Sequence, residues 1–173
     1  LDIVRGDVNF AGGSISGNSA TDGSGGGMYC QTTTLDINDC TLSNNSTVNI
    51  SGNGGWGGAI NFYGGVSGQK IFNCLITGNS ASENGGAIYC TDAKPSIGNC
   101  TFSGDSAGGY GGAIFANHSS EPNIINSIFN NCSKHAIHEE DGDSGSGGKA
   151  IVRYSVFYNN TDGDYYDSGT YLV

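Results

Sequence analysis

The stretch GGAIYC at 85–90 decides the fold, because the chain rewrites it as GGGMYC at 25–30, GGAINF at 57–62 and GGAIFA at 111–116. A second recurring segment begins at residues 14, 40, 74, 100, 127 and 155, so successive starts lie 26, 34, 26, 27 and 28 residues apart. One period of about 27 residues fits all of them, with one insertion of about eight residues in the second unit. Such a period indicates a solenoid of stacked coils.

Equivalent positions of these units hold residues of one chemical type. The first position is small throughout, from Ser14 to Ser155, and two residues later stand Ser16, Leu42, Ile76, Phe102, Phe129 and Phe157. Three residues before the first position stand Ile37, Ile71, Ile97, Ile124 and Val152. Small and large apolar residues that alternate with period two predict a strand with one buried face. Cys40, Cys74 and Cys100 occupy the first position in three consecutive units, and one further column reads Asn18, Asn45, Asn79, Asp105, Cys132 and Asn160.

We therefore predict one all-β domain over residues 1–173, a right-handed single-stranded parallel β-helix of about six coils with ~27 residues per coil. Coils stacked ~4.8 Å apart turn the columns into continuous ladders, and inward Asn side chains can hydrogen-bond between coils. Cys132 interrupts the Asn ladder, so we expect a weaker corner there. The paired glycines allow a tight turn before each Ala-Ile strand. They do not form a phosphate-binding loop, since no GxxxxGK[ST] pattern accompanies them.

The repeated GGAI at 57–60, 85–88 and 111–114, together with Phe-x-x-Asn at 157–160 and the near-match FSGD at 102–105, resembles a known family. The pattern is similar to the repeats of the chlamydial polymorphic outer-membrane protein and autotransporter-passenger family, within the wider group of secreted bacterial right-handed β-helix proteins. The resemblance covers roughly residues 10–160. It implies an extracellular or cell-surface location, and it specifies the fold better than the activity, because the same coil carries adhesins, polysaccharide lyases and tail spikes.

The composition excludes several classes of function. Six Lys and Arg against sixteen Asp and Glu give a net charge of −10, whereas nucleic-acid binders and proteins of anionic membranes need a basic surface. No run of ~20 apolar residues could insert into a membrane. The chain begins at Leu1 rather than Met, so we expect a processed chain or a fragment of a longer one.

The six cysteines allow three interpretations. Cys40, Cys74 and Cys100 share a column whose Cα spacing is compatible with one disulfide between coils, but side chains in register point the same way, which is poor geometry for a bridge. The favoured interpretation is small buried hydrophobic residues. A reactive or metal-binding role has the least support, because no CxxC spacing occurs.

Acidic glycine-rich loops are the remaining chemical signal. The best candidate for a cation site, and so for Ca²⁺ as the one conceivable cofactor, is formed by Glu139, Glu140, Asp141 and Asp143. Solvated turn residues are the favoured alternative, because no complete calcium-loop pattern occurs. His135 and His138 lie three residues apart, so on a strand they should point to opposite faces, and we expect exposed histidines rather than a metal pair.

We expect a non-catalytic, extracellular adhesin-type segment that contacts a glycan or a host or cell-surface protein. Exposed aromatic residues on a rigid solenoid could supply the contact surface, namely Trp56, Tyr63, Tyr110, Tyr165 and Tyr166. Two alternatives remain open: a polysaccharide lyase or other carbohydrate-active enzyme, with Arg153 beside Asp141 and Asp143 as its best cation, and a structural spacer. Acids and a cation that converge beside an aromatic wall would favour the enzyme. Uncapped solenoid ends also predict end-to-end self-association.

Overall fold

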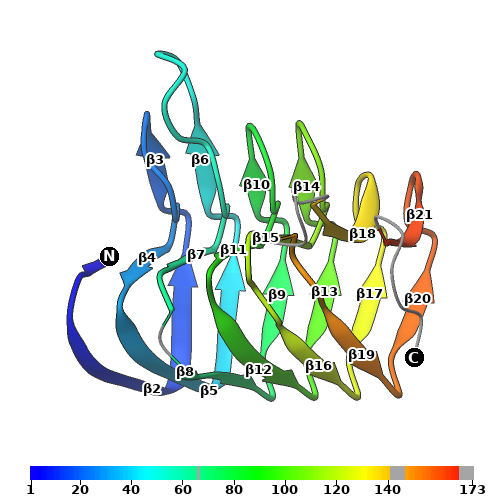
Figure 1. Ribbon diagram of the computed structural model, residues 1–173, viewed down its shortest axis with the longest axis horizontal. Coiled ribbons are helices and arrows are strands. Elements are labelled where there is room, and N and C mark those ends of the chain that lie inside the picture. The colour runs from blue at the N-terminus through cyan, green and yellow to red at the C-terminus, as the bar shows by residue number, and fades with distance from the viewer. Residues whose placement is uncertain (66, 141–146, 168–173) are drawn as a thin grey trace.

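In the computed structural model, which describes residues 1–65, 67–140 and 147–167, the chain winds into a parallel β-solenoid of about six coils with about 27 residues each. Figure 1 shows the coils side by side along the longest axis, with the first and last coils at opposite ends. The described residues form strands, turns and bends without a helix, and no helix among them could cross a membrane. The predicted fold class is confirmed.

The strands of the described residues form three sheets, and all strand pairs are parallel. The seven-stranded sheet holds β1 (Asp2–Ile3), β4 (Met28–Gln31), β7 (Ile60–Tyr63), β11 (Ile88–Thr91), β15 (Ile114–Asn117), β18 (His135–Glu139) and β21 (Gly163–Tyr166). The four-stranded sheet holds β3 (Ser19–Thr21), β6 (Ser46–Val48), β10 (Ser80–Ala81) and β14 (Ser106–Ala107). The ten-stranded sheet holds β2 (Gly6–Ser16), β5 (Thr33–Ser43), β8 (Ser67–Phe72), β9 (Leu75–Thr77), β12 (Lys94–Gly98), β13 (Thr101–Ser103), β16 (Asn123–Ile125), β17 (Ile128–Asn130), β19 (Ile151–Arg153) and β20 (Val156–Tyr158).

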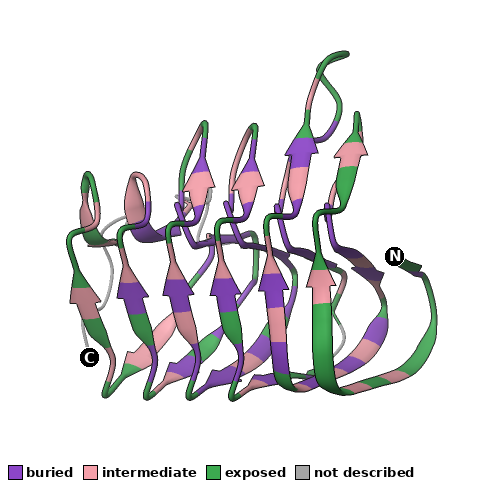
Figure 2. Ribbon diagram, turned by 180° about the vertical axis from the view of Figure 1, so that it is seen from behind, coloured by how far each residue is buried: buried purple, intermediate pink, exposed green. Residues whose placement is uncertain are grey.

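The core is a file of equivalent side chains from successive coils. Leu42 pairs with Ile76, Ile76 with Phe102, and the file continues through Phe129 to Phe157. The first four are fully buried, and Figure 2 shows a buried segment at the same height in consecutive strands. The rings stack, with centroids 4.7 Å apart for Phe102 and Phe129 and 4.9 Å apart for Phe129 and Phe157. The predicted ladder of the interior is therefore confirmed.

The predicted alignment of the first coil is wrong by one residue. Gly13, not Ser14, lies opposite Cys40, and Ile15, not Ser16, lies opposite Leu42. The physical reason is that a shift of one residue exchanges the two faces of a strand. With the predicted register, Ile15 would point to solvent and Ser16 into the core.

The asparagine ladder forms as predicted through the first four coils. The backbone N–H and Nδ2 of Asn45 both donate to Oδ1 of Asn79, at 3.1 and 3.0 Å, and Asn18 makes the same two bonds to Asn45. Asn79 donates in the same way to Oδ1 of Asp105, at 2.8 and 2.9 Å. Cys132 accepts no such pair, but its N–H donates to Oδ1 of Asn160.

The turn between the four-stranded and seven-stranded sheets explains the glycine pairs. Gly85 has a φ of 68°, which L side chains rarely adopt. A Cβ on Gly86 would lie 2.0 Å from the carbonyl oxygen of Gly112 in the next coil. These turns carry the arms that Figure 1 shows at β3, β6, β10 and β14, and the longest arm follows β6, at the predicted insertion. Before β18 and β21 the loops are shorter and no fifth strand joins the four-stranded sheet of the described residues.

All six cysteines are buried with free thiols, as the favoured interpretation predicted. The thiols of Cys40, Cys74 and Cys100 each donate to the carbonyl two residues earlier, at 3.1, 3.0 and 3.2 Å. Burial raises the pKa of the Cys30 and Cys132 thiols to about 12, so these groups are neutral and unreactive at physiological pH.

Candidate functional site

The outer face of the seven-stranded sheet carries a column of mostly aromatic residues. Strand register aligns the residues that follow the inward Met28, the inward Ile of the next four coils and Tyr165. This column reads Tyr29, Asn61, Tyr89, Phe115, His138 and Tyr166. These residues alternate with the inward-pointing ones, since successive side chains of a strand point to opposite faces. Sequence reasoning missed this column. Its signal was the position directly after the Ile of GGAI.

The rings of this column stack upon each other. Centroid distances are 5.4 Å between Tyr89 and Phe115, 5.4 Å between Phe115 and His138, and 4.4 Å between His138 and Tyr166. The spacing of parallel coils imposes these values, because equivalent side chains repeat every ~4.8 Å. Tyr89, Phe115 and His138 are buried, whereas Tyr166 at the end of the column is exposed.

Two residues of the arms extend the stack. Trp56 and Tyr110 each precede a Gly-Gly pair, and each stacks on a column ring of the next coil. Trp56 lies 5.7 Å from Tyr89, and Tyr110 lies 4.6 Å from His138. The structure thus joins Trp56, Tyr110 and Tyr166, which the sequence only marked as separate exposed aromatics.

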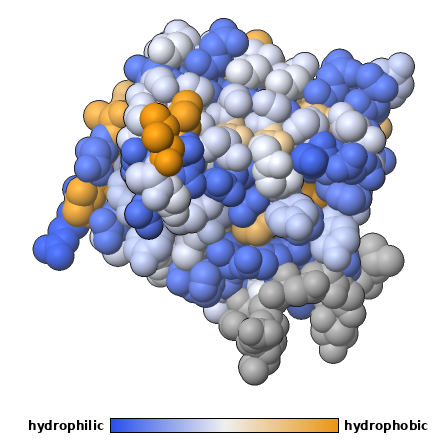
Figure 3. Space-filling model, turned by 90° about the horizontal axis from the view of Figure 1, so that it is seen from above, coloured by the Kyte–Doolittle hydropathy of each residue, from blue (hydrophilic) through white to orange (hydrophobic). Residues whose placement is uncertain are grey.

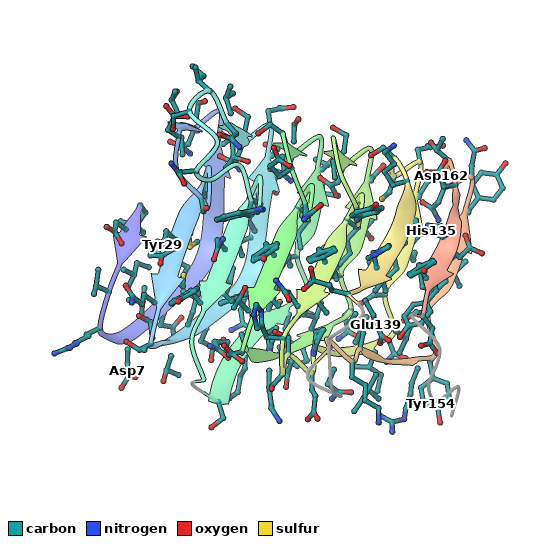
Figure 4. All side chains as sticks on the ribbon, turned by 45° about the horizontal axis from the view of Figure 1, so that its top comes forward. Asp7, Tyr29, His135, Glu139, Tyr154 and Asp162 are labelled. Atoms are coloured by element: carbon teal, nitrogen blue, oxygen red, sulfur yellow. The ribbon has the colours of Figure 1, made fainter. Side chains whose placement is uncertain are left out.

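A hollow of about 380 Å³ opens beside the end of this stack, where the four-stranded sheet ends at β14. Its walls include Tyr110 and Tyr166, and its polar groups include Lys134, His135, Glu140 and Asp162. Figure 4 shows His135 and Asp162 close together at one end of the molecule and Tyr29 at the other. Figure 3 shows that the face formed by the tips of the arms is mostly hydrophilic, with hydrophobic residues in small separate groups.

The expectation that His135 and His138 point to opposite faces is wrong. Both line the hollow, and their ring centroids are 6.3 Å apart. Lys134, with a φ of 57°, turns the chain immediately before β18. His135 is the first residue of that strand, so its side chain is not held to the alternation of the strand interior. His138 is buried in the aromatic stack rather than exposed.

The predicted acidic cluster is divided by the strand. Glu139 is buried and accepts hydrogen bonds from the Tyr165 hydroxyl and the Ala150 N–H, while Glu140 lines the hollow. Burial raises the pKa of Glu139 above its ordinary value, although the bond from Tyr165 opposes the shift. Asp141 and Asp143 lie outside the described residues. Within the described ranges no group of three or more His, Cys, Asp or Glu side chains could hold a metal ion.

The other candidates lie apart from the hollow. Tyr63 is exposed at the end of β7. Tyr165 packs against the core, and its hydroxyl donates to Glu139; burial and this bond raise its pKa above the ordinary value. Arg153 belongs to β19 of the ten-stranded sheet, where it donates to Asn123 Oδ1 at 3.4 Å.

Comparison with known proteins gives one short match. The family model of the Chlamydia polymorphic membrane protein repeat matches residues 73–91. These residues hold β9, β10 and β11, with the GGAI turn between the last two strands. No curated protein and no solved structure matches the chain. At a coarse level the match supports the resemblance of the repeat to that family.

Proposed function

We propose that this chain is a non-catalytic segment of a bacterial surface protein that binds glycans through the outer face of its seven-stranded sheet. The observation that carries the proposal is the aromatic stack, which ends in the exposed rings of Tyr110 and Tyr166 beside the hollow. Aromatic faces on a rigid support offer large contact area at little entropic cost. The match to a repeat of polymorphic membrane proteins supports a surface-associated role.

A carbohydrate-active enzyme is the second candidate, and one observation favours it. The hollow brings Lys134, Glu140 and Asp162 to one aromatic wall, the convergence expected of such an enzyme. We rank binding first because general acid catalysis uses a carboxyl group whose pKa is raised towards neutrality. Burial raises the pKa of Glu139, but its carboxylate is held by Tyr165 and Ala150.

A glycan array probed with and without calcium tests the proposal. We expect binding to some glycans, and at least a tenfold loss of affinity for Tyr166→Ala. The matched control is Tyr158→Ala, because Tyr158 is also an exposed tyrosine of the last coil but belongs to β20 of another sheet. Equal loss in both variants, or no binding to any glycan, contradicts the proposal and leaves the spacer.

Incubation of the bound glycans with the protein separates binding from catalysis. New reducing ends or unsaturated uronate absorbance would establish the enzyme. Intact glycans after long incubation are the expected result. Calcium dependence of binding would support the cation site near Glu140.

A further inference from the structure

The hollow lies where the chain departs from the Gly-Gly pair that precedes the Ile or Met strand in the earlier coils. Strand register places Gly25, Gly57, Gly85 and Gly111 in one column, and the next residues of that column are Lys134 and Asp162. In the neighbouring column His135 follows Gly112. The fifth coil therefore replaces Gly-Gly by Lys-His.

Close backbone contact explains the glycines of the earlier coils. A Cβ at Gly86 would lie 2.0 Å from the Gly112 oxygen, and a Cβ at Gly112 would lie 1.7 Å from the Ser133 oxygen. The fifth coil has a shorter loop in place of the arm, because Ile137 follows Phe129 by eight positions where Ile114 follows Phe102 by twelve. The shorter loop leaves the space in which larger side chains fit.

Lys134 nevertheless keeps the left-handed backbone of the glycines it replaces, with a φ of 57°. This conformation is unfavourable for a residue with a side chain and is retained where the surroundings or the function require it. Its neighbour His135 lies over Gly163 of the last coil, since a Cβ there would be 3.1 Å from His135 Cδ2. The side chains of Lys134 and His135 both line the hollow.

We propose that this hollow binds one neutral sugar unit of a glycan, with Tyr110 and Tyr166 as the apolar walls and the side chains of the broken repeat as the polar contacts. The inference rests on the proposed function and names its ligand. Lys134 supplies donors and the carboxylates of Glu140 and Asp162 supply acceptors, which together suit the hydroxyls of a pyranose ring. The volume of about 380 Å³ lies in the range of small-ligand pockets.

Charge selects against an acidic glycan. The hollow sets two carboxylates against one ammonium group, and the whole chain carries a net charge of −10. A polyanionic saccharide would meet like charge at the site and during approach. A neutral hexose or N-acetylhexosamine meets no such penalty.

The decisive variant restores the repeat. Lys134→Gly with His135→Gly returns the Gly-Gly pair of the other coils, so this protein should melt at or above the wild-type temperature. We expect it to lose at least tenfold in affinity for neutral oligosaccharides, measured by titration calorimetry with N-acetylglucosamine, mannose and galactose oligomers. Oligogalacturonate, the acidic probe, should bind at least tenfold more weakly than the best neutral oligomer.

The outcomes distinguish this inference from the proposed function. Wild-type affinity in the restored variant, with affinity lost in Trp56→Ala, would overturn the hollow as the site but keep glycan binding by the stack. A preference for oligogalacturonate would overturn the neutral ligand. Binding to no oligosaccharide in any protein would overturn both. If the double variant loses affinity because it unfolds, Tyr166→Ala provides the test instead. The inference then requires that Tyr166→Ala weakens binding and lowers the melting temperature by no more than Tyr158→Ala does.

Discussion

At the scale of single residues, Asp105 occupies the place of an amide in the asparagine ladder. Nδ2 of the two preceding ladder residues donates to a carbonyl of the previous coil, from Asn45 to Ile15 at 2.8 Å and from Asn79 to Leu42 at 3.0 Å. Oδ2 of Asp105 has no hydrogen-bond partner among the described residues. Since Ile76 pairs with Leu42, the equivalent carbonyl for Asp105 is that of Ile76, and an ionised carboxylate beside a carbonyl oxygen is unfavourable. Burial raises the pKa of Asp105 to about 8, so the neutral acid can donate where the amide would.

Asp105→Asn should stabilise the fold in a pH-dependent way. The folded-state pKa of about 8 lies above the ordinary value of 3.8, so wild-type stability is complete below about pH 4 and falls as the pH rises through 8. The difference in free energy of unfolding between variant and wild type should be small at pH 4, grow with pH and level off above pH 8 at about 5–6 kcal/mol at most, since a change of one in pKa corresponds to about 1.36 kcal/mol. Urea unfolding across this range measures it.

The control for this prediction is Asp105→Ala. It removes the acceptor of both Asn79 donors and should be destabilising at acidic pH as well. A constant difference between Asp105→Asn and wild type from pH 4 to 9 would show that the carboxyl is ionised in the folded protein throughout.

At the scale of elements, the arms and their glycine pairs determine which part of the outer sheet is covered. Trp56 and Tyr110 of the arms stack on buried rings of the next coil, Tyr89 and His138, whereas Tyr166 at the end of the column is exposed. The arm can return so closely to the next coil only where no Cβ intervenes, as at Gly86. The glycine pairs are thus a packing requirement of each arm as well as a turn.

Gly86→Ala should destabilise the protein by about 3 kcal/mol, the upper end of typical overpacking costs. Its Cβ would lie 2.0 Å from the Gly112 oxygen and 2.5 Å from the Ser106 carbonyl carbon, which are backbone atoms of the next coil. Thermal and urea unfolding measure the loss. Gly65→Ala is the matched control, because its nearest atom is the Asp92 oxygen at 3.8 Å. Similar stability of the two variants would refute the packing argument.

At the scale of the whole molecule, both ends of the solenoid leave strands with a single partner. Within the described residues β2 pairs with β5 alone, and β20 pairs with β17 alone. Phe10 and Ile15 of the first coil pack on the core but are only partly buried. An exposed strand edge beside apolar side chains favours the addition of another strand.

We predict concentration-dependent end-to-end association of this chain, measurable by sedimentation velocity from micromolar to millimolar protein. Phe10→Lys with Ile15→Lys places charge on the open end and should shift the sedimentation coefficient towards that of a monomer. Leu75→Lys is the control, because Leu75 is an exposed apolar residue in the middle of the solenoid. A wild-type protein that stays monomeric at every concentration would contradict the prediction.

The sequence by itself determined the coil length, the parallel stack and the identity of the interior. Those features repeat because each buried residue touches its equivalents above and below, so the columns of Leu42 and Asn45 must keep one chemical type from coil to coil. The correct register of the first coil could also have been inferred from the sequence, because Ile15 rather than Ser16 continues the apolar column of Leu42.

Only the tertiary structure decided the candidate site. The outer column changes from Tyr to Asn, Phe and His, because an outward side chain has no identical environment to preserve. Whether Glu139 or Glu140 reaches the surface depends on strand alternation after the turn at Lys134, and the hollow depends on the length of one arm relative to the next. Contacts between coils of unequal length are set by the three-dimensional stack, so no pattern along one repeat could reveal them.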